Sequence, residues 1–221
     1  MSRSYEQICH IARALDVLGE RWTLLIVREL TLGPRRYTDL LGALPGMGTS
    51  LLAARLKHLA DHDVVRRTTL PGPGRAAAYE LGARGAALMP ILGSLAEWGG
   101  GLEDPPPGYA DRAAWSVVAM RLTAPGEAAG FATLTELIVG EETFWLQGDG
   151  ERVRAEIGPA PVTPGLRLTC EKETFYALAK GRVSVGDAMA STDLAVDGDP
   201  GTARLFFELF TLPDGHPTTA R

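Results

Sequence analysis

The sequence predicts two domains of different fold class, a mainly α domain with one β-hairpin and then an α+β domain. Apolar residues recur at helical spacing through most of the first half, whereas the second half mixes alternating and helical runs. A Gly- and Pro-rich run, Gly99–Gly108, separates the two. We therefore expect domains at residues 1–100 and 114–213, a linker at 101–113 and a tail at 214–221.

Charge supports this division. Residues 1–100 carry 12 Lys/Arg against 9 Asp/Glu, and residues 101–221 carry 10 against 18, which together account for the chain's 22 basic and 27 acidic residues. A mildly basic half joined to an acidic half suits a nucleic-acid-binding module tied to a second function. The chain has no apolar run of about 18 residues, no apolar signal-peptide core near Met1, and two distant cysteines. We therefore expect a cytoplasmic protein with reduced thiols and no membrane partner.

The order of elements in the first half is typical of a winged helix. Helices are expected at about residues 8–18, 21–32, 37–44, 49–62 and 83–98, strands at 64–70 and 77–81, and a turn at 71–75. In such a module the second of two short helices enters the DNA major groove and the hairpin forms the wing. The first half is thus predicted to be a mainly α winged helix-turn-helix domain that binds double-stranded DNA.

The helix at 49–62 has two distinct faces. Leu52, Leu56 and Leu59 form an apolar stripe, whereas the face that carries Ala53 and Lys57 is small and polar. Small side chains let a helix backbone approach base edges closely. We expect Thr49 or Ser50 to cap this helix. The alternative, a solvated outer face of an ordinary amphipathic helix, is equally good from the helix alone, and the hairpin that follows favours DNA binding.

Two further features of the first half extend this prediction. Arg75 lies at the tip of a projecting Gly/Pro turn, from which it can reach phosphate or the minor groove, or serve only as a solubilising charge. The helix at 83–98 carries more apolar surface than a domain of this size covers. It is expected to form a dimer seam, to pack on the first helix of its own chain, or both. Pro90 is expected to kink this helix or to lie in an early turn.

Several motifs together resemble the HxlR-type transcriptional regulators. They are Cys9–Leu18 with the following Gly19–Leu30, Gly33–Tyr37, Leu51–Leu59 and Tyr79–Leu81. The resemblance implies a homodimeric winged-helix regulator that binds an operator with two related half-sites. DNA-contacting positions are then expected on the groove helix, the wing and the basic pair before the third helix: Thr49, Ser50, Ala53, Ala54, Lys57, His58, Arg75, Arg35 and Arg36. The family often has Ser or Thr where Gly48 stands and glycine where Asp63 stands.

Cys9 occupies a position that some family members use as a redox or electrophile sensor. A sensing thiol needs a stabilised thiolate, and His10 or Arg13 can supply positive charge nearby. The alternative is a half-buried cysteine packed at the first helix as a small hydrophobe. We favour the packed cysteine, because a whole second domain offers another place for sensing.

The second half contains both strands and helices, and they segregate along the chain. Strands are expected at residues 115–122, 142–147, 152–157, 167–170 and 194–197, helices at 172–180, 183–191 and 201–210, and a helical or mixed segment at 131–139. This succession predicts an α+β domain. From Thr169 to Asp199 it resembles the sterol-carrier-protein type of lipid-binding domain.

That resemblance implies a hydrophobic cavity for an apolar small-molecule effector. Its candidate lining is aromatic: Phe131, Phe144, Trp145, Phe175, Phe206, Phe207 and Phe210. Ordinary core packing is the alternative for each of these side chains.

Catalysis finds little support in the sequence. There is no Gly-rich phosphate loop, and Cys170 has no base at a recognisable spacing. His58 and His62 have an i, i+4 spacing that suits a metal, but no third ligand is evident. We predict no enzyme, no cofactor and no metal, and hence a ligand-responsive DNA-binding transcriptional regulator. The alternative is a lipid or small-molecule carrier, or an enzyme, whose winged helix serves protein contacts.

Overall fold

The computed structural model describes residues 4–70, 75–103, 106 and 108–213. The chain divides into two compact units, residues 1–89 and 90–221. The described residues between Gly100 and Ala113 are in neither helix nor strand, and their role as a domain linker stays a prediction. None of the described helices combines the length and the apolar character needed to cross a membrane.

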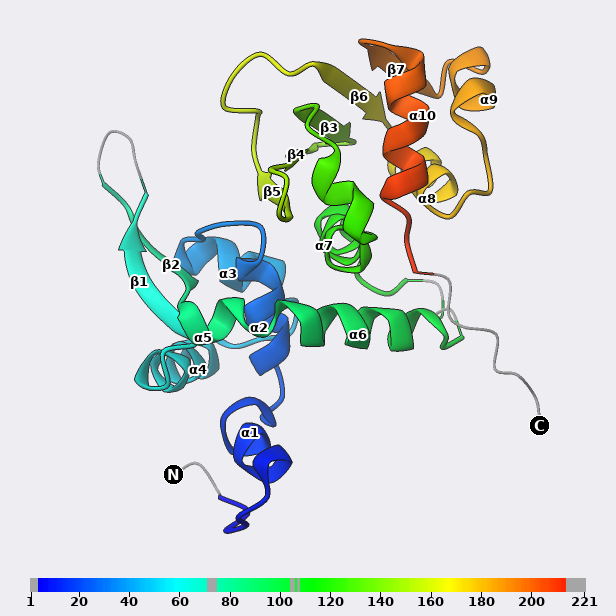
Figure 1. The fold of residues 1–221 in the computed structure, drawn as a ribbon. Helices are drawn as coiled ribbons and strands as arrows, with labels where there is room; N and C mark the ends of the chain where they lie inside the picture. The colour runs from blue at the N-terminus through cyan, green and yellow to red at the C-terminus, as the bar shows by residue number, and fades with distance from the viewer. Residues whose placement is uncertain (1–3, 71–74, 104–105, 107, 214–221) are drawn as a thin grey trace, which may run out of the picture. The chain divides into compact units, whose positions relative to one another are not determined.

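The N-terminal unit combines short helices with a β-hairpin (Figure 1). Its elements are α1 (His10–Leu18), α2 (Thr23–Leu30), α3 (Tyr37–Ala43), α4 (Thr49–Asp61), β1 (Val65–Thr69), β2 (Ala77–Leu81) and α5 (Ala83–Ala86). The two strands pair antiparallel from Val65–Leu81 to Thr69–Ala77, and Arg35 adds an isolated bridge to Tyr79. This order confirms the predicted winged helix. The predicted turn at 71–75 lies outside the described residues except for Arg75.

Aliphatic side chains form the core of this unit. Leu52, Leu56 and Leu59 of α4 are at most 1% exposed, as are Ile26 of α2 and Leu40 of α3. Their spacing of three and four residues places them on one side of α4, so that the opposite side of the helix faces solvent. The apolar stripe predicted for this helix is therefore confirmed.

The chain between α4 and α5 passes unusually close to itself. Asp63 has φ 57°, a left-handed conformation that is unfavourable for a residue with a Cβ atom. This conformation explains why glycine suits that position. A Cβ atom added to Gly85 in α5 would lie 2.1 Å from the Val64 carbonyl oxygen. Only glycine permits that approach of α5 to the start of the hairpin.

The C-terminal unit is an α+β fold, as predicted. It begins with α6 (Met89–Gly100), whose first turn contains Pro90, where the missing N–H has no helical partner to lose. The other elements are α7 (Ala113–Thr123), η1 (Gly126–Gly130), β3 (Thr135–Val139), β4 (Glu142–Gly148), β5 (Val153–Ile157), β6 (Leu166–Cys170), α8 (Lys172–Ala179), α9 (Val185–Ala190), β7 (Leu194–Asp197) and α10 (Pro200–Leu209). The predicted single helix at 83–98 is wrong in one respect, because Ala87 and Leu88 form a turn that separates α5 from α6.

The strands of this unit form one mixed sheet with the order β5-β4-β3-β6-β7. The central pair, β3 and β6, is parallel, and the other pairs are antiparallel. One face of the sheet is buried, with Leu137, Phe144 and Leu168 side by side in the register and each 0% exposed. Helix α7 contacts β4 and β5, and α10 contacts β6. Alternate residues therefore point to a buried face and to a partly exposed face.

Two predictions for this half are wrong. Residues 115–122 form part of helix α7 rather than a strand, because Val117, Val118 and Met120 pack inward from the helix. For residues 131–139, predicted to be helical or mixed, the helical alternative is wrong, since Thr135–Val139 is the central strand β3 with partners on both sides. In both segments the run of apolar residues fits either structure, and only the tertiary contacts decide between them.

Candidate nucleic-acid interface

The outward face of α4 consists of small or flexible side chains. Thr49, Ser50, Ala53, Ala54 and Lys57 are all exposed. The Lys57 ammonium lies 3.7 Å from Asp61 one turn later, a solvated pair with little energetic weight. The face therefore presents backbone, methyl groups and hydroxyls to a partner and leaves room for close approach.

The start of α4 differs from the prediction. Gly48 is the N-cap residue, with an extended backbone and no side chain, while Thr49 and Ser50 already lie within the helix. The predicted cap by Thr49 or Ser50 is therefore wrong, since a cap residue must precede the first helical turn. No side chain caps the first turn of α4, so its N–H groups carry the partial positive charge of the helix end without a capping partner.

Contacts from α3 and α2 hold the start of α4 in place. The Tyr37 hydroxyl of α3 donates a hydrogen bond to the Thr49 carbonyl oxygen at 2.6 Å. The Trp22 ring lies beside Gly46 in the turn between α3 and α4, where an added Cβ atom would be 3.8 Å from it. The aromatic side chains before α2 and at the start of α3 thus fix the position of the groove helix.

His58 lies on a different side of α4 from the other predicted DNA-binding positions of that helix. It is half-buried, and its Nε2 is 3.2 Å from the Val17 carbonyl oxygen of α1. The Nδ1 of His62 is 2.9 Å from the His58 carbonyl oxygen, in position to donate. Both imidazoles therefore have partners within the protein. The described residues contain no cluster of three or more His, Cys, Asp or Glu that could hold a metal.

The hairpin carries arginines on its outer surface. Arg66 of β1 pairs with Glu80 of β2 at 2.9 Å, and the guanidinium of Arg67 lies 6.0 Å from the centre of the Tyr79 ring. Arg75 is exposed where the described part of the hairpin resumes. Strand pairing and the cation–π contact hold two of these cations on the wing.

The two arginines before α3 differ in their exposure to solvent. Arg35 is half-buried, and its backbone exchanges hydrogen bonds with Tyr79 at 2.9 and 2.8 Å. Arg36 is exposed, and its N–H donates to Asp39 at 3.2 Å at the start of α3. Of the two predicted residues, Arg36 is the one whose side chain is open to a phosphate.

The aromatic residues predicted to line a cavity do not lie on one surface. The rings of Phe131, Phe206 and Phe210 pack together with centroids 4.8–6.0 Å apart, so these side chains contact one another. Trp145 alternates with Phe144 along β4 and therefore points to the opposite face of the sheet. There its register neighbours are Glu136 and Glu156. Ligand binding by this aromatic set stays a prediction.

The two cysteines differ in environment. Cys9 is exposed at the residue that precedes α1, so the interpretation of a half-buried, packed cysteine is wrong. Cys9 lies at the end of α1 that is open to solvent, so the helix does not cover its thiol. Cys170 is buried in β6, and desolvation together with the neighbouring Glu171 raises the pKa of its thiol to about 12. Its burial and raised pKa both favour the protonated thiol, which is the less reactive form.

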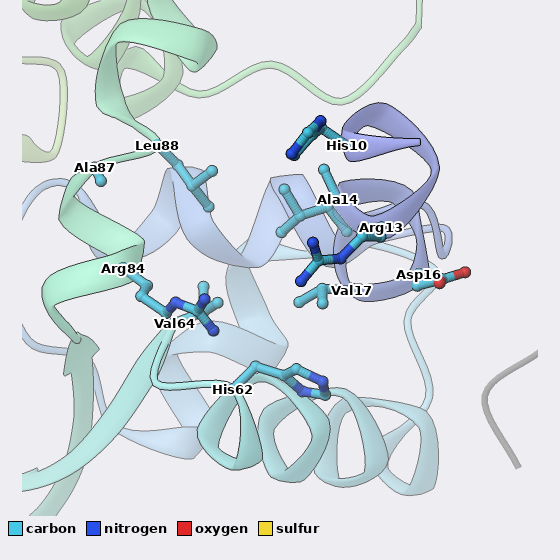
Figure 2. Close-up of a pocket in the computed structure, with 11 residues that line it drawn as sticks. His10, Arg13, Ala14, Asp16, Val17, His62, Val64, Arg84, Ala87 and Leu88 are labelled. Carbon is cyan, nitrogen blue, oxygen red and sulfur yellow. The ribbon is translucent and has the colours of Figure 1, made fainter. Parts of the chain in front are cut away.

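Sequence reasoning missed a cavity in the N-terminal unit. It lies between α1, the residues that follow α4, and α5, and its lining includes His10, Arg13, His62 and Arg84 (Figure 2). A signal existed in the spacing of His10, Arg13, Ala14 and Val17, which places them on one face of α1. The partners that follow α4 and those in and after α5 lie more than 40 positions away in the chain, and only the fold brings them together.

Comparison with known proteins gives the same picture for the first half. Residues 17–105 match the model of the HxlR-like helix-turn-helix family. A helix-turn-helix transcriptional regulator of Synechocystis sp. is 40% identical over 85 residues, which are 38% of this chain and 63% of that protein. The present chain thus spans less than two thirds of this relative.

Two regulators of Bacillus subtilis are covered more fully. YvaP is 38% identical over 86 residues, 39% of this chain and 80% of its own. YodB is 33% identical over 85 residues, 38% of this chain and 76% of its own. The solved reduced form of YodB aligns with 45% of this chain and 99% of that structure, with 30% identity and a TM-score of 0.39. YodB has also been solved in a quinone-bound form.

These relatives are named as transcriptional regulators and not as enzymes. The family model ends at residue 105, so the greater part of the C-terminal unit lies outside the match. The shared segment contains α2 to α6 and therefore the complete helix-turn-helix and its wing. This chain belongs to the HxlR-like helix-turn-helix family and is a transcriptional regulator with a DNA-binding helix-turn-helix domain.

Proposed function

We propose that the protein is a dimeric, ligand-responsive regulator that inserts α4 of each subunit into the major groove of one operator half-site. The observation that carries this proposal is the exposed, small-residue face of α4, which begins at an N-terminus without a side-chain cap. Arg36, Arg66, Arg67 and Arg75 are exposed on the elements beside it. Phosphate contacts by these cations and by the first-turn N–H groups supply most of the affinity. A regulator of this kind works in the cytoplasm, where the chromosome lies.

The test begins with duplexes selected from a random pool by the purified protein, and measures their binding by fluorescence anisotropy. The double variant Lys57→Ala/Arg75→Ala is expected to lose at least about tenfold in affinity, because each phosphate contact contributes to counterion release. The slope of log affinity against log salt should fall by about 2. Arg182→Ala, an exposed arginine of the C-terminal unit, is the matched control. Unchanged affinity and slope in the double variant would rule out this docking.

Exposed apolar faces support the dimer. Near α1 the exposed apolar side chains are Ile8, which precedes the helix, and Ile11 and Leu15 within it. On α6 they are Ile91, Leu95 and Trp98, which are 51, 45 and 69% exposed. Faces of this kind on a water-facing helix indicate protein contact. To bind half-sites one turn of DNA apart, a twofold-related pair must place its groove helices about 34 Å apart. Sedimentation should show a dimer that Leu95→Glu/Trp98→Glu converts to monomer, with Glu97→Gln as the control. A monomeric parent protein would contradict the proposal.

The C-terminal unit is proposed to hold an apolar effector in a sterol-carrier-like fold. The arrangement of a mixed sheet with helices packed on it supports this proposal. Native mass spectrometry of the purified protein tests it, because a co-purified apolar molecule adds a discrete mass. A protein that carries no such mass and gains no stability from added fatty acids or sterols would contradict it. If the protein carries an apolar molecule but selects no duplex, the alternative of a carrier with a winged helix used for protein contacts takes its place.

A thiol-sensing role for Cys9 remains the second candidate, because the residue is exposed at the start of α1. An oxidant or quinone that modifies it would alter the residue from which α1 begins, since the Arg13 N–H donates to the Cys9 carbonyl oxygen at 3.0 Å. Operator release by a quinone should then disappear in Cys9→Ser and persist in Cys170→Ser. Equal release by the parent protein and Cys9→Ser would remove this candidate.

A further inference from the structure

The cavity between α1 and α5 has the features of a small-molecule site. Its volume is about 630 Å³, within the range of pockets that hold a compact organic ligand. Figure 2 shows Arg13 of α1 and Arg84 of α5 with their guanidinium groups directed toward each other across the cavity. His10 and His62 lie at its edges. Four nitrogen-rich side chains from three segments thus converge on one space.

The two arginines have no carboxylate partner among residues 4–70, 75–103, 106 and 108–213 within ion-pair distance. The acidic residue in the lining is Asp16, and its carboxylate accepts hydrogen bonds from the Ser4 hydroxyl at 3.0 Å and the Tyr5 N–H at 2.8 Å. Figure 2 shows that this carboxylate points away from Arg13. Two like charges that face one cavity repel each other, and an anion between them removes that repulsion.

The rest of the lining is apolar. It is formed by Ala14, Val17, Leu18, Val64, Ala87 and Leu88. A fully hydrated inorganic anion would leave this surface without a partner, whereas a ligand with an apolar body covers it. The guanidinium fork is suited to two carboxylate oxygens at once. The cavity therefore matches an anionic head and an apolar body of modest size.

We infer that this cavity is a binding site for a small aryl or short acyl carboxylate, whose carboxylate lies between Arg13 and Arg84. The site is separate from the effector proposed for the C-terminal unit, both in its residues and in its chemistry. It adds an anionic ligand to a protein whose other proposed ligand is apolar.

The cavity is also connected to the groove helix. His62 follows the last residue of α4 and lines the cavity, and His58, one turn earlier, contacts the Val17 carbonyl oxygen of α1. A ligand held by α1 and α5 therefore stabilises one arrangement of α1 against the C-terminal end of α4. By linkage, a ligand that prefers one arrangement changes the affinity for DNA. This consequence, unlike the site itself, rests on the proposed DNA-binding function.

The experiment uses the full chain and 1-naphthoate as the probe, with 1-naphthalenemethanol as its neutral counterpart, both titrated by calorimetry without DNA. We expect saturable binding of 1-naphthoate and binding at least about tenfold weaker for the alcohol, because a charge-assisted contact is lost. Arg13→Gln/Arg84→Gln should weaken binding of 1-naphthoate by a similar factor, and Arg13→Lys/Arg84→Lys should restore part of it. Arg21→Gln, an exposed arginine outside the lining, is the control and should bind as the parent does.

Three results would overturn the assignment. They are no saturable binding of 1-naphthoate at millimolar concentration, equal binding of the acid and the alcohol, and unchanged binding by the Arg13→Gln/Arg84→Gln variant with a native circular dichroism spectrum. A separate anisotropy titration with DNA, in the presence and absence of 1-naphthoate, tests the coupling. If the parent protein binds no DNA, the proposed function is wrong, but the calorimetric result for 1-naphthoate still stands.

Discussion

The two units fill their interiors with different side chains. All six phenylalanines of the chain lie in the C-terminal unit, where Phe144, Phe175, Phe206 and Phe210 are fully buried. In the N-terminal unit the largest fully buried side chains are leucine and isoleucine, and the backbone of α5 approaches the hairpin through Gly85. The stability of the C-terminal unit should thus be lowered most by substitutions that remove a buried ring. The stability of the N-terminal unit should be lowered by substitutions that add a methyl group at its close backbone contacts.

The largest expected effect is the loss of an aromatic ring. Phe206→Ala removes a ring that contacts Phe131, Phe207 and Phe210, and should lower the free energy of unfolding of the C-terminal unit by about 3–5 kcal/mol. Hydrogen exchange resolved by peptide should place the loss in residues 113–210. Leu56→Ala in α4 is the matched change and should cost about 2–5 kcal/mol in the N-terminal unit alone. A larger loss for Leu56→Ala than for Phe206→Ala would break the comparison.

A single added methyl group tests the other half of the comparison. Gly85→Ala would place a Cβ atom 2.1 Å from the Val64 carbonyl oxygen, so α5 must move away from the hairpin. We expect a loss of about 1–3 kcal/mol, measured by chemical denaturation. Gly42→Ala in α3 meets no atom within 4 Å and should instead stabilise that helix by up to about 1 kcal/mol. Equal effects of the two substitutions would show that the close approach is unimportant.

A smaller effect is expected where the chain turns between α4 and β1. Asp63→Gly removes a Cβ atom from a left-handed conformation and should raise the free energy of unfolding by about 0.5–1 kcal/mol. Asp63→Ala keeps the Cβ atom and should give no such gain. The two variants are compared by their denaturation midpoints. If both variants are equally stable, the backbone conformation at this residue does not limit stability.

The smallest effect concerns an exposed carboxylate in the C-terminal unit. Hydrogen bonds from Arg154 and from the N–H groups of Arg152 and Glu151 lower the pKa of Asp149 from 3.8 to about 2. A lowered pKa in the folded state means that stability is present above about pH 4 and is lost as pH falls from about 4 to 2. Asp149→Asn should therefore flatten the dependence of stability on pH in this window, whereas Glu151→Gln should not. An unchanged pH profile in Asp149→Asn would contradict this role.

The sequence predicts a segment correctly where the spacing of its apolar residues fits only one kind of element. Leu52, Leu56 and Leu59 fit only a helix, because their spacing of four and three residues would scatter them over both faces of a strand. The groove face of α4 could be read from the same spacing. Trp115–Leu122 and Phe131–Val139, in contrast, contain apolar residues on several sides, so helix and strand fit equally well. Their final structures depend on partners, since α7 packs on β4 and β5 and β3 pairs with β4 and β6.

The candidate sites divide in the same way. Exposed positions on one helix, such as Ala53 and Lys57, follow from local spacing alone. Three features could not be predicted from the sequence and are known only from the structure. They are the inward contact of His58, the opposite orientation of Trp145 and the absence of a side-chain cap at Gly48. The cavity lined by Arg13 and Arg84 was the least predictable feature, because its residues come from three separate segments.

By itself, the sequence determined the order of elements in the winged helix, the buried face of α4 and the family to which the chain is similar. These features follow from residues three or four positions apart and from turn residues such as Gly33 and Pro34. Short stretches of sequence are therefore enough to determine them. The tertiary structure alone decided the path of the central sheet, the close approach of α5 to Val64 and the two cations that face each other across the cavity. Those features depend on which distant segments pack together, and no local pattern encodes that choice.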